Sequence, residues 1–295
     1  MVSDTRKILI LGGSGYIGRN LFRRLGRDLC LATYHRSALP GGVSFDAAAD
    51  RVQDLFDNPS AFSHAIILLG ETNIDKCAKD QEHCQAVNVH SIIRVIEDLQ
   101  ALNIVPVFSS TDNVFDGEKG SYIETDAANP VVVYGAQKRE VEVYLETHVE
   151  NYCIFRLSKV YGSTQSDGTL FTSWYEALLK GETIQIARDQ VISPIFIDDV
   201  VDGILKLVEI DARGLYHLCG PDSLSRSIFL QGLIEQTKDI PRPESQVEEL
   251  NINDFALAEH RPLNVSMLSN RFRAETGLAP RSYTKIVDAI LKSFV

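Results

Sequence analysis

The chain has 295 residues, of which 44% are hydrophobic and 23% are charged, a balance typical of a globular protein rather than a disordered one. Its formal net charge of −11 argues against nucleic acid as a partner, because phosphate binding requires concentrated lysine and arginine. The longest apolar runs, such as AIILLG at 65–70, are too short to span a bilayer, so we expect no membrane partner.

The cysteines indicate a reducing location. Five cysteines form no CxxC pair, and their odd number favours free thiols in a cytoplasmic enzyme. The first residues, MVSDTRKILILGGSG, lack the pattern of a secretory leader, which agrees with that expectation. Cys77, His83 and Cys84 lie close in sequence, but no further ligand has a suitable spacing, so we predict no metal site.

Short apolar runs alternate with amphipathic stretches through the first half of the chain. Apolar residues recur at helical spacing between these runs, as at Ile17, Leu21 and Leu25. Near-continuous apolar strands separated by helices predict an α/β fold, a Rossmann-type doubly wound parallel sheet. The predicted strands are KILIL (7–11), CLATY (30–34), HAIILL (64–69), VPVFSS (105–110) and CIFRL (153–157).

The alternation loosens from about residue 162, where polar loops such as YGSTQSDGT (161–169) appear. IDDVVDGILKLVE (197–209) predicts a helix with aspartates in its first turn, and GLYHLCG (214–220) predicts one more strand. We therefore predict a Rossmann domain at 1–161, which also receives about 190–219. A smaller, discontinuous C-terminal lobe built mainly from 162–295 is expected to bind the substrate.

The first predicted strand ends in a glycine-rich turn, LGGSGYIGRNL, that opens an amphipathic helix. Gly12 permits a tight turn, Gly15 lets the backbone approach a pyrophosphate, and Gly18 allows close packing of helix on strand. Backbone N–H groups at the start of the helix then face the phosphates. A plain loop is the alternative, and the strand–turn–helix context disfavours it. We therefore predict a dinucleotide site.

The second predicted strand indicates which dinucleotide binds. NAD sites usually place an acidic residue there for the ribose 2′-hydroxyl, but CLATYHRS (30–37) has none. It ends in His35, Arg36 and Ser37, which suit a 2′-phosphate, so NADP is favoured and NAD stays possible. The alternative for Arg36 is a solvated surface charge. Asp46, after the next apolar stretch, could accept a hydrogen bond from the adenine amine.

Tyr134 and Lys138 stand four residues apart in VYGAQK (133–138), so on a helix both project from one face. A free tyrosine titrates at about 10, and a nearby ammonium favours the phenolate and lowers that pKa. The same ammonium can hydrogen-bond the ribose of a dinucleotide. The predicted strand at 105–110 runs out into Ser109, Ser110 and Thr111, which place hydroxyl donors at the same edge of the sheet.

These residues resemble the extended short-chain dehydrogenase/reductase superfamily, and most closely its dTDP-4-dehydrorhamnose reductase family. The resemblance covers essentially the whole chain. It implies catalytic roles for Thr111, Tyr134 and Lys138. The segments that carry it are STDNVFDG (110–117), ETDAANPVVVYGAQKREVE (124–142), RLSKVYG (156–162), ARDQVISPIFIDDV (187–200), GLYHLCG (214–220) and HRPLNVSMLSNRF (260–272).

By resemblance, the reaction is reduction by NADPH of a 4-keto group on a nucleotide-activated deoxysugar. The substrate partner is then a nucleotide-sugar, and homodimers are common in this superfamily. The expected cofactor-binding residues are Gly12, Gly15, Tyr16, Ile17, Gly18, His35, Arg36, Asp46, Leu69, Gly70, Tyr134 and Lys138. The expected substrate-binding residues are Thr111, Asp112, Asn113, Gln190 and Arg261. Arg261 could contact a phosphate of the nucleotide-sugar or form a surface ion pair. Gln190 could line the substrate pocket or belong to a structural loop. Both alternatives stay open for each residue.

The sequence departs from the family on the substrate side. The family usually has tyrosine at Asn113 and an aromatic residue at Lys159, and DQVISPI (189–195) lacks the usual glycine and threonine. These departures leave open an NADP-binding regulatory subunit resembling the β subunit of methionine adenosyltransferase. They also leave open a nucleotide-sugar epimerase or dehydratase. The segment TDNVFDG, in which Thr111 is not followed by an acidic pair, favours the simple reductase.

Overall fold

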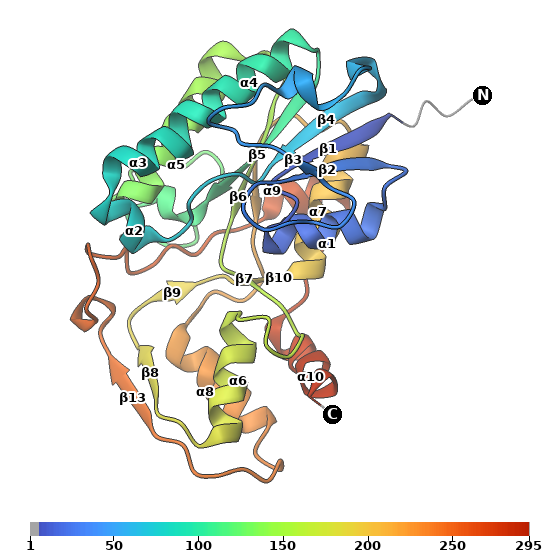
Figure 1. The fold of residues 1–295 in the computed structure, drawn as a ribbon. Helices are drawn as coiled ribbons and strands as arrows, with labels where there is room; N and C mark the ends of the chain where they lie inside the picture. The colour runs from blue at the N-terminus through green and yellow to red at the C-terminus, as the bar shows by residue number, and fades with distance from the viewer. Residues whose placement is uncertain (1–5, 295) are drawn as a thin grey trace. The chain divides into compact units, whose positions relative to one another are not determined.

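The computed structural model describes residues 6–294, which form two compact units, each assembled from separate stretches of the chain (Figure 1). Unit 1 runs to Thr111 and also includes Val133–Arg156 and Ile204–Tyr216. Unit 2 comprises Asp112–Val132, Leu157–Gly203 and the chain from His217 onward. Within 6–294, no helix combines the length and the apolar character needed to cross a bilayer.

Unit 1 is built on a seven-stranded sheet with the strand order β11-β6-β5-β4-β1-β2-β3. β1 pairs in parallel with β2 on one side and β4 on the other, and β4 pairs in parallel with β5. The strand order therefore reverses at β1, the position where doubly wound sheets bind ligands. This confirms the predicted fold class. The strands are β1 Lys7–Leu11, β2 Cys30–Tyr34, β3 Val43–Ser44, β4 Phe62–Ile67, β5 Val105–Thr111, β6 Cys153–Leu157 and β11 Gly214–Leu218.

Helices cover the sheet of unit 1. α4 (Ser91–Ala101) and α5 (Val133–His148) pack on one face, and α1 (Tyr16–Leu25) lies on the other (Figure 1). The core under α4 and α5 uses alternate residues of the strands, such as Leu9 and Leu11, because successive side chains of a strand point to opposite faces. α2 (Ile74–Lys79), α3 (Gln81–Gln85) and a π-helical turn at Ala86–His90 lead into α4, and α7 spans Ile197–Glu209.

Unit 2 combines helices with three two-stranded pairings. β7 (Val160–Tyr161) pairs with β10 (Ile195–Phe196), β9 (Val191–Ile192) pairs with β12 (Leu224–Ser225), and β8 (Ile184–Ala187) pairs with β13 (Val247–Leu250). Its helices are α6 Leu170–Lys180, α8 Arg226–Gln236, α9 Asn270–Thr276 and α10 Tyr283–Ser293. Trp174 is buried with its ring edge-on to Phe171 at 5.5 Å, so it serves packing.

Candidate active site

The glycine-rich turn between β1 and α1 has the geometry that its sequence predicts. Gly12 has φ +90°, and its N–H donates to Thr33 Oγ1 at 3.1 Å. A Cβ on Gly18 would lie 2.4 Å from the Gly12 carbonyl oxygen, so only glycine lets α1 pack this closely. The sequence analysis missed Gly13, where a Cβ would lie 2.8 Å from that of Ala32.

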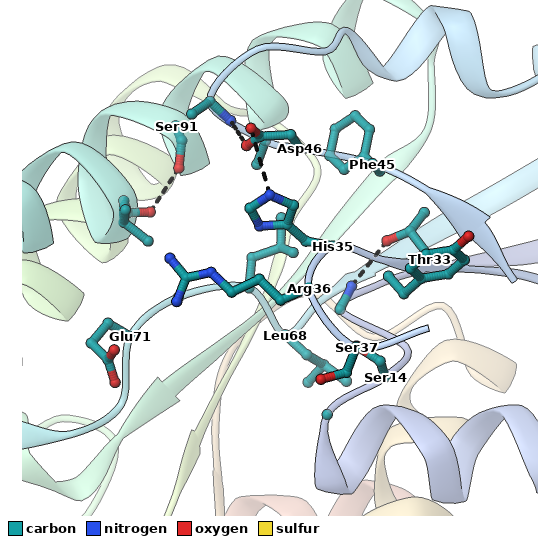
Figure 2. A pocket seen from close by; sticks show the side chains of 18 of the residues that line it. Ser14, Thr33, His35, Arg36, Ser37, Phe45, Asp46, Leu68, Glu71 and Ser91 are labelled. Atoms are coloured by element: carbon teal, nitrogen blue, oxygen red, sulfur yellow. Dashed lines mark hydrogen bonds and ion pairs between the residues drawn. The ribbon is translucent and has the colours of Figure 1, made fainter. Parts of the chain in front are cut away.

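A cavity of about 440 Å³ opens at the carboxyl ends of β1, β2 and β4, where Figure 2 shows the residues that line it. Seven of the twelve residues predicted to bind the cofactor line the cavity, whereas Tyr16, Ile17, Gly18, Tyr134 and Lys138 do not. Its position at the strand reversal and its size suit a nucleotide. The seven are Gly12, Gly15, His35, Arg36, Asp46, Leu69 and Gly70.

Two basic side chains at the end of β2 lie on the wall of this cavity (Figure 2). His35 Nε2 is 3.7 Å from Asp46 Oδ2, and Asp46 Oδ1 also accepts the N–H of Ala48 at 2.9 Å. Asp46 therefore holds the local turn and His35, and it lies on the wall of the cavity. Arg36 is exposed and forms no hydrogen bond or ion pair within 6–294, which leaves its guanidinium available to a phosphate.

An ion pair that the sequence analysis missed also lines the cavity. Lys76 Nζ lies 2.5 Å from Glu71 Oε2, and this hydrogen bond raises the pKa of Lys76. Burial opposes ionisation of Glu71, but the Lys76 ammonium and the N–H of Asn73 outweigh it and lower the pKa of Glu71. Both groups are therefore charged at neutral pH. The positive charge of Lys76 is compensated, unlike that of Arg36.

The Tyr134–Lys138 pair lies in the first two turns of α5, beside the end of β5. Lys138 is 3% exposed, and its Nζ donates to the Ser109 carbonyl at 2.9 Å and lies 5.9 Å from the centroid of the Tyr134 ring. Burial lowers the pKa of Lys138 to about 8, and the negative charge of Glu142 opposes that shift. Thr111, the last residue of β5, is buried at the same end of the strand. The predicted phenol and ammonium thus lie close together.

A buried amide network supports this region. Asn88, in the π-helical turn, accepts the N–H of Glu71 at 2.7 Å and donates to Gln137 Oε1 at 2.8 Å. A Cβ on Gly70 would lie 2.8 Å from Asn88 Oδ1 and 4.0 Å from Lys138 Nζ, so the loop after β4 passes close to Lys138. A polar residue at a buried helical position is the sequence signal that could have indicated this network.

A second buried network lies one helical turn beyond Lys138. The carboxylate of Glu142 is fully buried, and it receives two hydrogen bonds from Arg156 of β6, at 2.9 and 2.7 Å. Ser110 Oγ donates to the same carboxylate at 2.5 Å. Glu142 therefore joins α5 to β5 and β6 directly behind the residues with predicted catalytic roles. Its link to Arg156 depends on tertiary packing, and the sequence analysis missed it.

The predicted substrate residues from Asp112 onward belong to unit 2. Asn113 Nδ2 donates to Asp112 Oδ1 at 2.8 Å. Gln190 is buried, and its Oε1 accepts a hydrogen bond of 2.6 Å from Arg226 Nε, a residue that the sequence analysis did not single out. Arg261 Nη1 lies 3.6 Å from Glu259 Oε1, so its charge has an acidic partner, as in the ion-pair interpretation.

Residues 6–294 contain no group of three histidine, cysteine or carboxylate side chains that could hold a metal ion. Cys77 and Cys84, considered above as ligands, instead pack in an apolar cluster against Tyr134. Burial raises the pKa of Cys77 to about 12, which disfavours the thiolate that metal binding and nucleophilic chemistry both require.

The strand order, the glycine-rich turn and the buried Tyr–Lys pair define an NAD(P)-dependent oxidoreductase of the extended short-chain dehydrogenase/reductase type. The model of one family, RmlD substrate binding domain, matches residues 6–295. The chain belongs to this family. The predicted recognition is thereby confirmed.

Several proteins of known name are similar to the chain. A dTDP-4-dehydrorhamnose reductase of Sinorhizobium fredii is 24% identical over 281 residues, with 92% of each chain covered. The probable low-salt glycan biosynthesis reductase Agl14 of Haloferax volcanii is 30% identical over 243 residues, 77% of this chain and 78% of its own. The methionine adenosyltransferase 2 subunit beta of Danio rerio is 24% identical over 234 residues, which are 75% of this chain and 71% of its own.

Solved structures show the same fold. A hypothetical dTDP-4-dehydrorhamnose reductase from Sulfolobus tokodaii is 26% identical with a TM-score of 0.81, covering 96% of this chain and 98% of its own. A dTDP-4-dehydrorhamnose reductase from Bacillus anthracis, solved in complex with NADP, is 22% identical with a TM-score of 0.79. The match covers 97% of this chain and 99% of that one.

Proposed function

We propose that this chain reduces a 4-keto group on a nucleotide-activated deoxysugar with NADPH. The observation that carries the proposal is the buried ammonium of Lys138, held 2.9 Å from the Ser109 carbonyl and 5.9 Å from the Tyr134 ring. A lysine is rarely buried without a function, because desolvation opposes its charge. The similarity to dTDP-4-dehydrorhamnose reductase over 92% of the chain supports the choice of a sugar nucleotide as substrate.

NADPH is favoured as the cofactor. Arg36 has no partner within residues 6–294, and no carboxylate stands at the end of β2 to hold a 2′-hydroxyl. The turn at Gly12 to Gly18 would hold the pyrophosphate against the start of α1. The wall formed by His35, Arg36 and Asp46 would hold the adenosine 2′-phosphate and the base.

When bound, NADPH supplies a hydride to the carbonyl carbon of the sugar. Tyr134 would donate a proton to the carbonyl oxygen as negative charge develops there, and Thr111 would hold that oxygen with its hydroxyl. The Lys138 ammonium favours the phenolate that Tyr134 becomes, and it can also hydrogen-bond the nicotinamide ribose. Its hydrogen bond to the Ser109 carbonyl fixes the ammonium for both tasks.

The test is NADPH consumption with a panel of nucleotide 4-keto-sugars, measured by loss of NADPH absorbance. The wild-type chain is expected to oxidise NADPH with at least one of them. Tyr134→Phe should slow turnover by about 10²–10⁴-fold, the usual contribution of a positioned acid. Tyr144→Phe on the same helix is the matched control, since its hydroxyl donates to the exposed Glu97 carboxylate, at 3.2 Å. Full activity in Tyr134→Phe would refute the assignment.

A regulatory subunit is the second candidate, because the methionine adenosyltransferase 2 subunit beta is 24% identical over 234 residues. A chain of that kind would bind NADP and alter the activity of a partner enzyme without consuming NADPH. The two candidates are separated by measuring methionine adenosyltransferase activity, with and without this chain, beside the NADPH assay.

We further propose a cytoplasmic location, supported by five buried cysteines that are all free. To test this proposal, the full-length protein is denatured without a reducing agent, and its free thiols are then labelled with a thiol reagent. Five reactive thiols are expected, whereas disulfide-bonded cysteines would contradict it.

A further inference from the structure

Glu71 brings a carboxylate to the wall of the cavity that suits the cofactor. It follows β4, in the loop that leads to α2. Figure 2 shows the Arg36 side chain extending from the end of β2 toward this loop. A phosphate bound by Arg36 would therefore be repelled by the carboxylate of Glu71. An acidic residue at this position requires a physical reason, because it opposes the anion that Arg36 attracts.

Glu71 is held in place by groups other than Lys76. Its backbone N–H donates to Asn88 Oδ1 at 2.7 Å, and its carbonyl accepts a hydrogen bond of 3.0 Å from Asn88 Nδ2. Its side-chain Oε1 accepts the N–H of Asn73 at 3.0 Å. These three hydrogen bonds do not depend on Lys76. The carboxylate can therefore keep its position when the lysine moves away.

Lys76 is the movable partner of this ion pair. It belongs to α2 and lines the same cavity, its side chain is 42% exposed, and its Nζ bonds Glu71 Oε2 at 2.5 Å. A lysine ammonium carries three donors on a flexible stem, so it can bind a carboxylate and a second anion by turn or together. Ion pairs that are exposed to this degree contribute little to stability, and the change of partner therefore costs little.

The charge of a 2′-phosphate calls for a second cation. A phosphate monoester carries about −1.5 to −2 charges at pH 7, more than Arg36 alone can neutralise. His35 on the same wall already faces Asp46, at 3.7 Å. Lys76 shares the cavity with Arg36, and the hydrogen bond from Glu71 raises its pKa and keeps it charged. Among the residues that line the cavity, Lys76 is thus the cation best suited to assist Arg36.

We propose that Lys76 is a second cationic ligand of the adenosine 2′-phosphate, and that Glu71 pairs with it when the phosphate is absent. The inference rests on the proposed function for its cofactor and adds two residues after β4 that determine cofactor specificity. When NADPH binds, Lys76 turns from Glu71 toward the phosphate, while Asn73 and Asn88 keep Glu71 in place. NADH has no 2′-phosphate, so the Lys76–Glu71 ion pair stays intact when NADH binds.

Titration calorimetry tests this proposal without the sugar substrate. The ligands form two matched pairs, NADPH with NADH and 2′,5′-ADP with 5′-AMP, and only the first of each pair carries the 2′-phosphate. Lys76→Met should weaken binding of NADPH and 2′,5′-ADP by about 10- to 100-fold, because a charge-assisted hydrogen bond is lost and Glu71 is left uncompensated. Glu71→Gln should strengthen binding of the same two ligands by about 3- to 10-fold, because it removes a repulsive charge and frees Lys76.

Lys79→Met, which removes an exposed charge from the same helix, is the matched control and should leave all four affinities unchanged. Thermal unfolding without ligand checks that each variant is folded, and either variant alone decides the question.

The opposite effects of the two variants, confined to ligands with the 2′-phosphate, would support the proposal. Equal losses for NADPH and NADH in Lys76→Met would overturn it. Weaker binding of NADH or 5′-AMP in Glu71→Gln would also overturn it, because the carboxylate would then hold a ribose hydroxyl. Unchanged affinities for NADPH in both variants would do the same. Reduction of a keto-sugar is measured separately, so the proposed reaction would still stand in each of these cases.

Discussion

The ammonium of Lys138 is held inside unit 1 at an electrostatic cost. Burial lowers the pKa of Lys138 from its ordinary 10.5 to about 8, and the hydrogen bond to the Ser109 carbonyl compensates only part of the lost hydration. One unit of pKa corresponds to about 1.4 kcal/mol of preference between the two protonation states. The buried charge therefore lowers the free energy of unfolding, although the proposed chemistry requires it.

Replacing this lysine should stabilise the protein and abolish its activity. Lys138→Met is expected to raise the free energy of unfolding at pH 7 by about 2 kcal/mol, the desolvation cost less one lost hydrogen bond. Because the folded pKa lies below the unfolded one, the unfolded chain binds more protons between pH 8 and 10.5. The free energy of unfolding of the wild-type protein should therefore rise with pH across that window. By its upper end, the wild type should be as stable as Lys138→Met.

Urea unfolding at several pH values measures this effect. Lys180→Met, on the exposed surface of α6, should change neither the stability nor its pH dependence. A wild-type protein that is as stable as Lys138→Met at pH 7 would show that the ammonium carries no such cost.

Arg36 determines the preference between the two nicotinamide cofactors in this account. Arg36→Ala should weaken NADPH binding by about 10- to 100-fold, because a charge-assisted hydrogen bond to the 2′-phosphate is lost. NADH lacks that phosphate, so its Kd should stay unchanged. Equal losses for both cofactors would assign Arg36 a different role. Arg271→Ala, which disrupts a surface ion pair with Glu275 on α9, is the control.

At the scale of elements, α5 carries the two proposed catalytic side chains and a buried carboxylate at every fourth residue. Tyr134, Lys138 and Glu142 therefore share one face, and that face meets the end of β5. Two hydrogen bonds make this junction, from Lys138 to the Ser109 carbonyl and from Ser110 to Glu142. The register of helix on strand is thus fixed by polar groups as well as by packing.

Removing the charge of Glu142 should loosen this junction. Glu142→Gln leaves Arg156 buried without its carboxylate, so we expect a loss of about 3–5 kcal/mol in the free energy of unfolding. Glu146→Gln on the same helix removes a more exposed partner of Arg139 and should cost less than about 1 kcal/mol. Urea unfolding compares the two variants. Similar values for both would mean that the buried network does not stabilise the fold.

The sequence predicted those features that depend on local patterns. The parallel sheet followed from apolar runs at strand length, and Gly12 and Gly18 followed from the steric demands of one turn. Asn88, Glu142, Arg156 and Arg226 escaped prediction because their partners lie 14 to 49 residues away in the chain. In the sequence, these charged and amide side chains cannot be distinguished from surface residues, because only the fold brings their partners close to them.

At the scale of the whole molecule, each unit is assembled from separate stretches of the chain. Asp112–Val132 belongs to unit 2 because Tyr122 pairs with Met267, and its N–H donates to the Ser266 carbonyl at 2.9 Å. Such pairings across about 145 residues leave no pattern in a single sequence. The sequence could therefore indicate where the alternation of strands and helices loosens, but not which unit each later segment joins.

Transfer of deuterium from NADPH labelled at the reactive carbon tests the central claim most directly. The account predicts a sugar alcohol one mass unit heavier than with unlabelled NADPH, formed in equal amount to the NADP released, as measured by mass spectrometry. Tyr134→Phe should yield the same labelled product much more slowly. An epimerase or dehydratase would regenerate its cofactor, and a regulatory subunit would leave it untouched. A product formed without net oxidation of NADPH, or no labelled product from any 4-keto-sugar nucleotide, would contradict the account.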